Sequence, residues 1–158
     1  IQLRKLVYFS FIFFMVFQVF LSVRHHLYKG NVHWTEEGHR MAWQMMLRSK
    51  SGNGKYEVVT YETQDREIVD PKKKMTRKQA ARLAYQPDMT WQFSRRLLEE
   101  YKAKGWNNIS IYYKGKVKLN KRPYAPLINP KVDLLSVEWE RFRHSDWIYP
   151  FPPERKKK

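Results

Sequence analysis

The side chains best suited to chemistry gather between positions 25 and 39. They are six histidines and glutamates: His25, His26, His33, Glu36, Glu37 and His39. Such groups bind metal ions and act as general acids or bases. No two of them have a recognised ligand spacing such as H-E-x-x-H, so we expect no metal site. The cluster is then either a hydrogen-bonded hinge or a set of proton-transfer groups, and the residue types leave both open.

Other catalytic signatures are absent from the sequence. The chain contains no cysteine, which removes disulfides, thiolate nucleophiles and zinc–thiolate sites. It also contains no G-x-S-x-G, Walker or G-x-G-x-x-G motif. Asp88, Asp133 and Asp146 occur singly. Asp88 is better explained as a helix cap, and Asp133 as a turn residue, than as a catalyst.

A long apolar segment precedes the cluster. Leu6 to Val23 reads LVYFSFIFFMVFQVFLSV and carries no charged residue. As an α-helix it would reach about 27 Å, close to the ~30 Å hydrocarbon core of a bilayer. We therefore predict that residues 1–24 form a transmembrane helix. Two alternatives are a secretory signal peptide, whose small-residue cleavage pattern is missing here, and a buried helix of a soluble domain.

The chain is strongly basic, with a formal net charge of +16. Such a surface attracts anionic lipids, nucleic acid or an acidic protein. Aromatic residues make up 16% of the sequence, which is high for a disordered tail, so we expect the polar part to fold around a core. No nucleic-acid-binding motif is recognisable, so we expect membrane lipids rather than nucleic acid as a partner.

Hydrophobic alternation predicts strands on both sides of a glycine-rich stretch. The segment HRMAWQMMLRS alternates apolar and polar residues, which is typical of a half-buried strand. Residues 51–55 (SGNGK) have the composition of a turn, and YEVVTYE follows as a second strand. These stretches predict a β-hairpin, followed by a polar loop over residues 64–74.

Two helices are predicted in the middle of the chain. Thr76-Arg77-Lys78-Gln79 has capping-box spacing and begins a short helix to about Ala84. Asp88 is a suitable N-cap for a second helix that runs to Lys104. Gly105 then follows as a natural terminator.

A further strand is predicted at NISIYYKGKVKL, with three inward residues, Ile109, Ile111 and Tyr113, and with its lysines on the solvent face. The later segment VDLLSVEWERF is ambiguous between strand and helix. The predicted fold class is one transmembrane α-helix followed by a small α+β, β-hairpin-rich domain. The expected parts are a membrane helix at 1–24, a juxtamembrane hinge at 25–40, the domain at 41–149 and a solvated basic tail at 150–158.

Several stretches resemble one known family. Residues 24–30 (RHHLYKG), 34–40 (WTEEGHR) and 43–48 (WQMMLR) are similar to the segment after the last membrane helix of vitamin K-dependent γ-carboxylase-like proteins. Bacterial members of that family are called HTTM (horizontally transferred transmembrane) proteins. Residues 87–93 resemble its P-D-M-x-x-Q-F/Y pattern. Residues 129–134 resemble its D-P-x-V-D pattern, with asparagine in place of the usual first aspartate.

The resemblance implies a multi-helix membrane enzyme family with an extracytoplasmic β-rich domain. Its carboxylases use reduced vitamin K, oxygen and carbon dioxide to carboxylate protein-bound glutamates. The earlier helices of the family, with the lysine that acts as base toward the hydroquinone, would lie before Ile1. We therefore expect a fragment, or the downstream half of a split protein. By the same resemblance this chain alone binds no cofactor, and reduced vitamin K or another quinone would bind in the intact protein.

The residues nearest the membrane are the predicted site. The resemblance implies catalytic or proton-relay roles for Glu36, Glu37 and His39. It implies substrate-binding roles for Trp34 and Arg40, with Arg40 suited to a substrate carboxylate. The predicted function is the extracytoplasmic C-terminal portion of a γ-carboxylase-like membrane protein, single-pass in this chain, in contact with lipids and other transmembrane helices. The alternatives are a non-catalytic scaffold subunit of a membrane complex and a membrane-tethered nucleic-acid-binding module.

Overall fold

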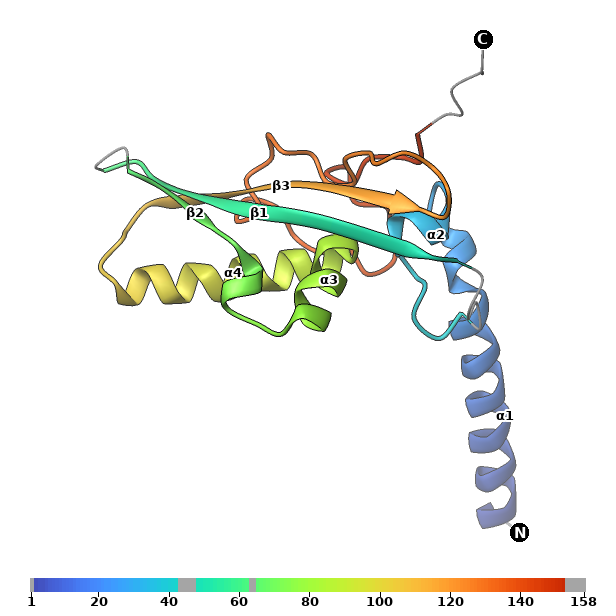
Figure 1. The fold of residues 1–158 in the computed structure, drawn as a ribbon. Helices are drawn as coiled ribbons and strands as arrows, with labels where there is room; N and C mark the ends of the chain where they lie inside the picture. The colour runs from blue at the N-terminus through green and yellow to red at the C-terminus, as the bar shows by residue number, and fades with distance from the viewer. Residues whose placement is uncertain (1, 43–47, 63–64, 153–158) are drawn as a thin grey trace.

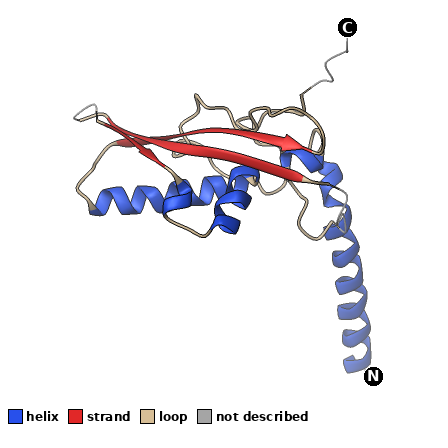
Figure 2. Cartoon of the chain, viewed as in Figure 1, coloured by secondary structure: helices blue, strands red, loops and turns tan. Residues whose placement is uncertain are grey.

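The computed structural model describes residues 2–42, 48–62 and 65–152. A long N-terminal helix leads into a small domain in which two helices cover one face of a three-stranded sheet (Figures 1 and 2). The elements in chain order are α1 (Gln2–Val23), η1 (Arg24–Leu27), α2 (Val32–Thr35), β1 (Lys50–Thr60), β2 (Arg66–Val69), η2 (Pro71–Lys73), α3 (Arg77–Tyr85), α4 (Pro87–Ala103) and β3 (Ile109–Leu119). The predicted fold class, a long apolar helix followed by a small α+β domain, is confirmed.

Helix α1 extends away from the domain (Figure 1). Its 22 residues give a length of about 33 Å at ~1.5 Å per residue. The helical stretch Gln2–Leu27 is long and apolar enough to cross a membrane, and its apolar window buries nothing against the rest of the chain. A helix buried in the chain's own core is therefore the wrong interpretation. A signal sequence passes the same test of length and composition.

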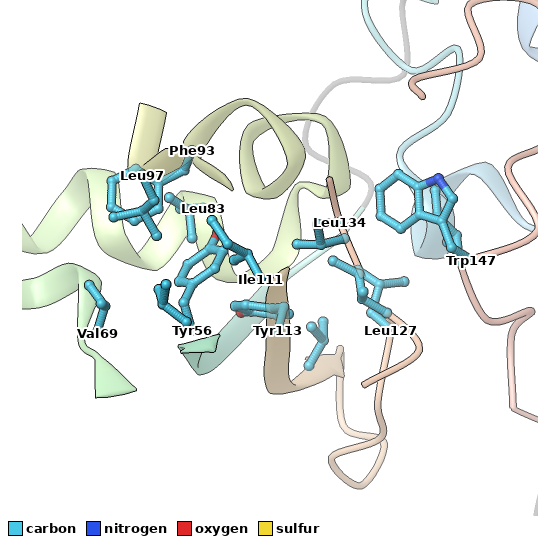
Figure 3. Close-up of a cluster of buried hydrophobic side chains, with 14 of the residues drawn as sticks. Tyr56, Val69, Leu83, Phe93, Leu97, Ile111, Tyr113, Leu127, Leu134 and Trp147 are labelled. Atoms are coloured by element: carbon cyan, nitrogen blue, oxygen red, sulfur yellow. The ribbon is translucent and has the colours of Figure 1, made fainter. Parts of the chain in front are cut away.

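The sheet has the strand order β2-β1-β3, and both pairs are antiparallel. Strands β1 and β3 pair along their full length, from Lys50↔Leu119 to Thr60↔Ile109. Because side chains alternate along a strand, one face of the sheet is apolar and packs against α3 and α4. Figure 3 shows this core, which includes Tyr56, Leu83, Phe93, Leu97, Ile111 and Tyr113. The inward residues predicted for β3 are buried, as expected.

The predicted hairpin turn at residues 51–55 is wrong. These residues lie inside β1 and pair with residues 114–118 of β3. Gly54 lies opposite Gly115, and a Cβ added to either would overlap the ring of Tyr113. The two glycines therefore leave space for a buried aromatic ring inside the sheet. A glycine within a strand often marks such a close approach rather than a turn.

Replacing Gly54 with alanine is expected to destabilise the domain by about 2 kcal/mol, because the added methyl overpacks against Tyr113. Thermal unfolding followed by tryptophan fluorescence would measure it. The adjacent Asn53→Ala, on the exposed face, is the control and should have little effect. Tyr113→Leu should cost less in the Gly54→Ala background than in the wild type. Additive effects of the two changes would contradict the proposed packing.

The helix predictions are mostly confirmed. Thr76 and Gln79 form a complete capping box at the start of α3. Gly105 follows α4 with a φ of +85°, as a terminating glycine should. Asp88, however, is not the N-cap of α4. Pro87 occupies the first helical position, to which its fixed φ is suited, so the cap is Gln86 and Asp88 lies in the first turn.

The remaining strand and loop predictions differ from the structure. The loop predicted at 64–74 contains β2, which pairs with residues 56–59 of β1, and then η2. Of the strand predicted at HRMAWQMMLRS, residues 43–47 lie outside the described part of the chain. The described residues 40–42 form a turn, and Met41 has a φ of +66°.

The segment after β3 crosses the domain largely as loops held by specific contacts. VDLLSVEWERF is neither strand nor helix. The carboxylate of Asp133 accepts hydrogen bonds from the backbone N–H groups of Ile111 and Leu135, both at 2.9 Å, and from the Ser110 hydroxyl at 2.7 Å. This confirms the turn role predicted for Asp133. It also attaches the segment to β3, where Leu134 is fully buried.

Candidate functional site

The juxtamembrane residues lead from α1 into the domain through the short helix α2, which lies beside the end of β3 (Figure 1). The Asn31 side chain accepts a hydrogen bond from the His33 N–H at the start of α2, and Glu36 ends this helix with a φ of +64°. That left-handed conformation turns the chain sharply. The Glu36 side chain is then directed into the domain, where only 4% of it is exposed.

Glu36 is the centre of a buried ionic group. Its Oε2 lies 2.5 Å from a terminal nitrogen of Arg48, and its Oε1 lies 3.1 Å from Nζ of Lys50. Lys50 also donates to the backbone oxygen of Trp34, and its side chain is 2% exposed. Burial raises the pKa of Glu36, while Lys50 and Arg48 oppose that rise. Burial likewise lowers the pKa of Lys50 to about 8, and Glu36 opposes that fall. The pKa values of Glu36 and Lys50 therefore differ less than those of a free glutamate and a free lysine.

Two histidines share the other terminal nitrogen of Arg48. Their Nδ1 atoms lie 3.4 Å away for His33 and 3.3 Å away for His39. Burial, with the charge of Arg48 as the next cause, lowers the pKa of His39 to about 4 and also lowers that of His33. A neutral ring beside a guanidinium can accept its hydrogen bond, whereas an imidazolium would be repelled.

The lowered pKa of His39 predicts acid destabilisation. The unfolded chain binds a proton below about pH 6.5 but the folded chain only near pH 4, so stability is expected to fall as pH drops through this window. Melting temperature measured against pH would show it, and His39→Gln should flatten the profile. The raised pKa of Glu36 acts in the opposite sense, so the comparison of variants isolates His39. The control is His26→Gln, at an exposed histidine; an equal flattening there would contradict the assignment.

Glu37 is fully buried and ties the juxtamembrane segment to the end of the chain. Its Oε1 accepts a hydrogen bond from the Ser145 N–H at 2.9 Å, and its Oε2 lies 2.6 Å from Nδ1 of His144. Trp34, 1% exposed, makes a parallel connection: its Nε1 donates to the backbone oxygen of Tyr149 at 3.0 Å. These contacts join residues more than a hundred positions apart.

A cavity of about 320 Å³ lies between the juxtamembrane segment and the beginning of α4. Its lining includes two of the predicted site residues, Glu36 and Arg40. The lining residues are Arg24, Tyr28, Glu36, Gly38, Arg40, Asp88, Gln92, Trp139, Arg141 and Phe142. Tyr28 closes one side by donating its hydroxyl hydrogen to the backbone oxygen of Arg141.

Positive charge exceeds negative charge around this cavity. Arg40 pairs with Asp88 at 2.5 Å, and Glu36 is neutralised by its own partners. Arg24 donates to the backbone oxygen of Arg40 at 3.1 Å, but its Nε is buried without a hydrogen-bond partner in the part of the chain that the structure describes. An unpartnered buried guanidinium nitrogen is a donor available to an anion. The cavity is therefore suited to an anionic group.

A family described as "Vitamin K-dependent gamma-carboxylase, lumenal domain" matches residues 3–154. The chain belongs to this family. No solved structure matches the chain at a significant level. The resemblance indicated by the motifs at 24–30, 34–40 and 87–93 is confirmed for the lumenal domain of the γ-carboxylase family.

The residues predicted for this γ-carboxylase-family domain fall into two groups in the structure. Glu36 and Arg40 line the cavity, with His39 connected to Glu36 through Arg48. Glu37 and Trp34 are buried and do not line it. Sequence reasoning missed further cavity and ionic residues, namely Arg24, Tyr28, Arg48, Lys50, Trp139 and Arg141. Arg24 and Tyr28 are inside the family motif RHHLYKG, which was the available signal, whereas nothing in the sequence marked Trp139 or Arg141.

The cavity is lined mainly by charged and polar side chains, so it does not fit the apolar ring and chain of a vitamin K hydroquinone. Helix α1 presents an extended apolar surface, and its phenylalanines are exposed. Among the described residues, no group of three or more His, Asp or Glu side chains could hold a metal ion.

Proposed function

We propose that this chain is the lumen-facing portion of a membrane-embedded γ-carboxylase, and that its cavity receives the side-chain carboxylate of a substrate glutamate. The observation that carries the proposal is the arginine-rich cavity directly after the apolar helix. Family membership supports the reaction class. The position supports the role, because a membrane-embedded reaction centre and a polypeptide substrate from the lumen would meet at this end of the domain.

The charges of the cavity suit the chemistry of glutamate carboxylation. The substrate side chain carries one carboxylate; its γ-carbon would lose a proton to the base of the reaction, and the carbanion left would add carbon dioxide to give a second carboxylate. Arg24, Arg40 and Arg141 line the cavity, and the buried Nε of Arg24 has no hydrogen-bond partner among the described residues. Guanidinium groups bind carboxylates through paired, charge-assisted hydrogen bonds. These side chains would orient the glutamate, and they would stabilise the additional charge as it forms.

Glu36 and Lys50 provide a proton-holding pair beside the cavity. Their oxygen and nitrogen atoms are 3.1 Å apart, with the pKa of the acid raised and that of the amine lowered to about 8. We propose that this pair, with His39 beside Arg48, moves protons at the edge of the site. The reduced quinone would supply the strong base of the reaction from neighbouring membrane helices.

Helix α1 would cross the bilayer once, packed against lipids and other transmembrane helices, with the domain on the lumenal side. The unusual exposure of aromatic residues on α1 supports such contacts. A scaffold subunit without catalytic activity is the second candidate. It is supported by Glu37, whose carboxylate holds His144 and Ser145 and does not belong to the cavity lining among the described residues.

The experiment is a carboxylation assay on the intact membrane protein. The purified protein, in detergent with reduced vitamin K and oxygen, would receive labelled bicarbonate and a glutamate-containing peptide. The proposal expects label in acid-stable form on the peptide, and no label when the reduced quinone is omitted. Failure to label a range of glutamate peptides, with the protein folded, would overturn the enzymatic proposal and favour the scaffold.

A further inference from the structure

The outer face of the sheet carries a set of lysines that the candidate site does not use. This face, opposite the helices, displays the side chains at odd positions in 51–59 of β1 and at even positions in 110–118 of β3. Four of them are lysines: Lys55, Lys114, Lys116 and Lys118. We call this set the lysine face. Three of the four are exposed and Lys118 is half-buried.

Like charges on this face are placed where they oppose folding. Lys55 lies directly opposite Lys114 in the antiparallel register, and like charges in that position are destabilising. Glu57 relieves part of the repulsion, since it lies 2.5 Å from Lys114 and 3.6 Å from Arg66. No carboxylate within the described ranges pairs with Lys55, Lys116 or Lys118. A solvated surface would carry mixed charge at lower cost, so this excess indicates an anionic ligand.

The orientation of the face argues against a bilayer as that ligand. Figure 1 shows α3 and α4 on the side of the sheet toward which α1 extends, so the lysine face is directed away from α1. If α1 crosses a membrane, the helices lie between the lysine face and the lipid. The ligand must then come from the aqueous phase.

The spacing of the lysines suits an extended polypeptide. Lys114, Lys116 and Lys118 are alternate residues of one strand, so their Cα atoms repeat about every 6.7 Å. An extended chain with acidic residues at alternate positions has the same repeat. We propose that the lysine face binds an acidic segment of a polypeptide in extended conformation. The choice of a polypeptide rests on the proposed function, because carboxylase substrates are polypeptides; the acidic character rests on the lysines alone.

The test is equilibrium binding of a fluorescein-labelled peptide of alternating glutamate and alanine to the intact protein, followed by anisotropy. The triple variant Lys114→Gln, Lys116→Gln, Lys118→Gln is expected to weaken binding about tenfold. Its matched control is Lys72→Gln, Lys73→Gln, Lys78→Gln, which removes the same charge from exposed lysines of η2 and α3 and should change affinity less than about twofold. The melting temperature of the first triple variant should stay unchanged or rise, because repulsion is removed.

Three results would overturn the proposal: no binding to the wild type, equal weakening in both triple variants, or tighter binding of a single-stranded oligonucleotide of equal charge to the same lysines. Because this readout needs no catalysis, it is separable from the carboxylation assay. If the enzyme is active but does not bind the acidic peptide, only the proposal that the lysine face binds an acidic polypeptide is rejected. If the protein binds the acidic peptide but does not carboxylate glutamate, the binding role of the lysine face is supported and the proposed carboxylase function is rejected.

Discussion

Replacing Glu37 with alanine is expected to lower the melting temperature of the domain by about 10 °C. The carboxylate is fully buried and accepts hydrogen bonds from the Ser145 N–H and from His144. Its removal leaves the buried Ser145 N–H and the half-buried His144 ring without this acceptor and opens a small void, which together cost about 3–5 kcal/mol. For a domain of this size each kcal/mol shifts the midpoint by roughly 2–4 °C.

Thermal unfolding followed by tryptophan fluorescence would measure this loss. The control is Glu138→Ala, at an exposed carboxylate of the same C-terminal segment, which should leave the midpoint unchanged. The catalytic role that the family resemblance implies for Glu37 makes the opposite prediction: lost activity with an unchanged midpoint. That outcome would show that the contacts with residues 144 and 145 contribute little to stability, and it would return Glu37 to the catalytic group.

Replacing Arg40 with alanine is expected to lower kcat/KM for carboxylation of a glutamate peptide by about 10- to 100-fold, the range of one lost charge-assisted hydrogen bond. The loss should appear mainly as a higher KM if Arg40 binds the carboxylate equally in the ground and transition states. Stability should change little, because the Arg40 side chain is 66% exposed. The carboxylation assay on the intact protein gives both constants.

Asp88→Asn is the matched variant for Arg40. Arg40 pairs with Asp88 at 2.5 Å, so Arg40→Ala removes this pair as well as any substrate contact. If only the pair matters, Asp88→Asn should reproduce the loss. If Arg40 binds substrate, Asp88→Asn frees the guanidinium and should keep or raise kcat/KM. Arg143→Ala, at an exposed arginine that does not line this cavity, controls for the loss of one positive charge.

Features set by neighbouring residues could be predicted from the sequence alone. The apolar helix needs only composition and length. The capping box at Thr76 and Gln79, and Gly105 after α4, depend on hydrogen bonds and backbone angles within a few residues. Alternation identified β3 and its inward side chains. The juxtamembrane motifs identified the family, because they are long and unusual in composition.

Features that depend on a partner distant in the sequence needed the tertiary structure. Gly54 has the appearance of a turn residue until the ring of Tyr113 is seen to occupy the space beside it. Glu37 is equally plausible as a catalyst until Ser145 and His144 are seen to engage its oxygens.

The cavity is the clearest case of this division. Arg24 and Arg141 are more than a hundred residues apart, yet both line it. Local sequence therefore determined the apolar helix, the positions of α3 and α4, strand β3 and the family to which the chain belongs, whereas β2 and the glycine-containing half of β1 were missed. Only the packing of the C-terminal loops against the juxtamembrane segment decided which charged groups are buried, paired or available to a ligand, because burial and pairing are set by contacts across the whole fold.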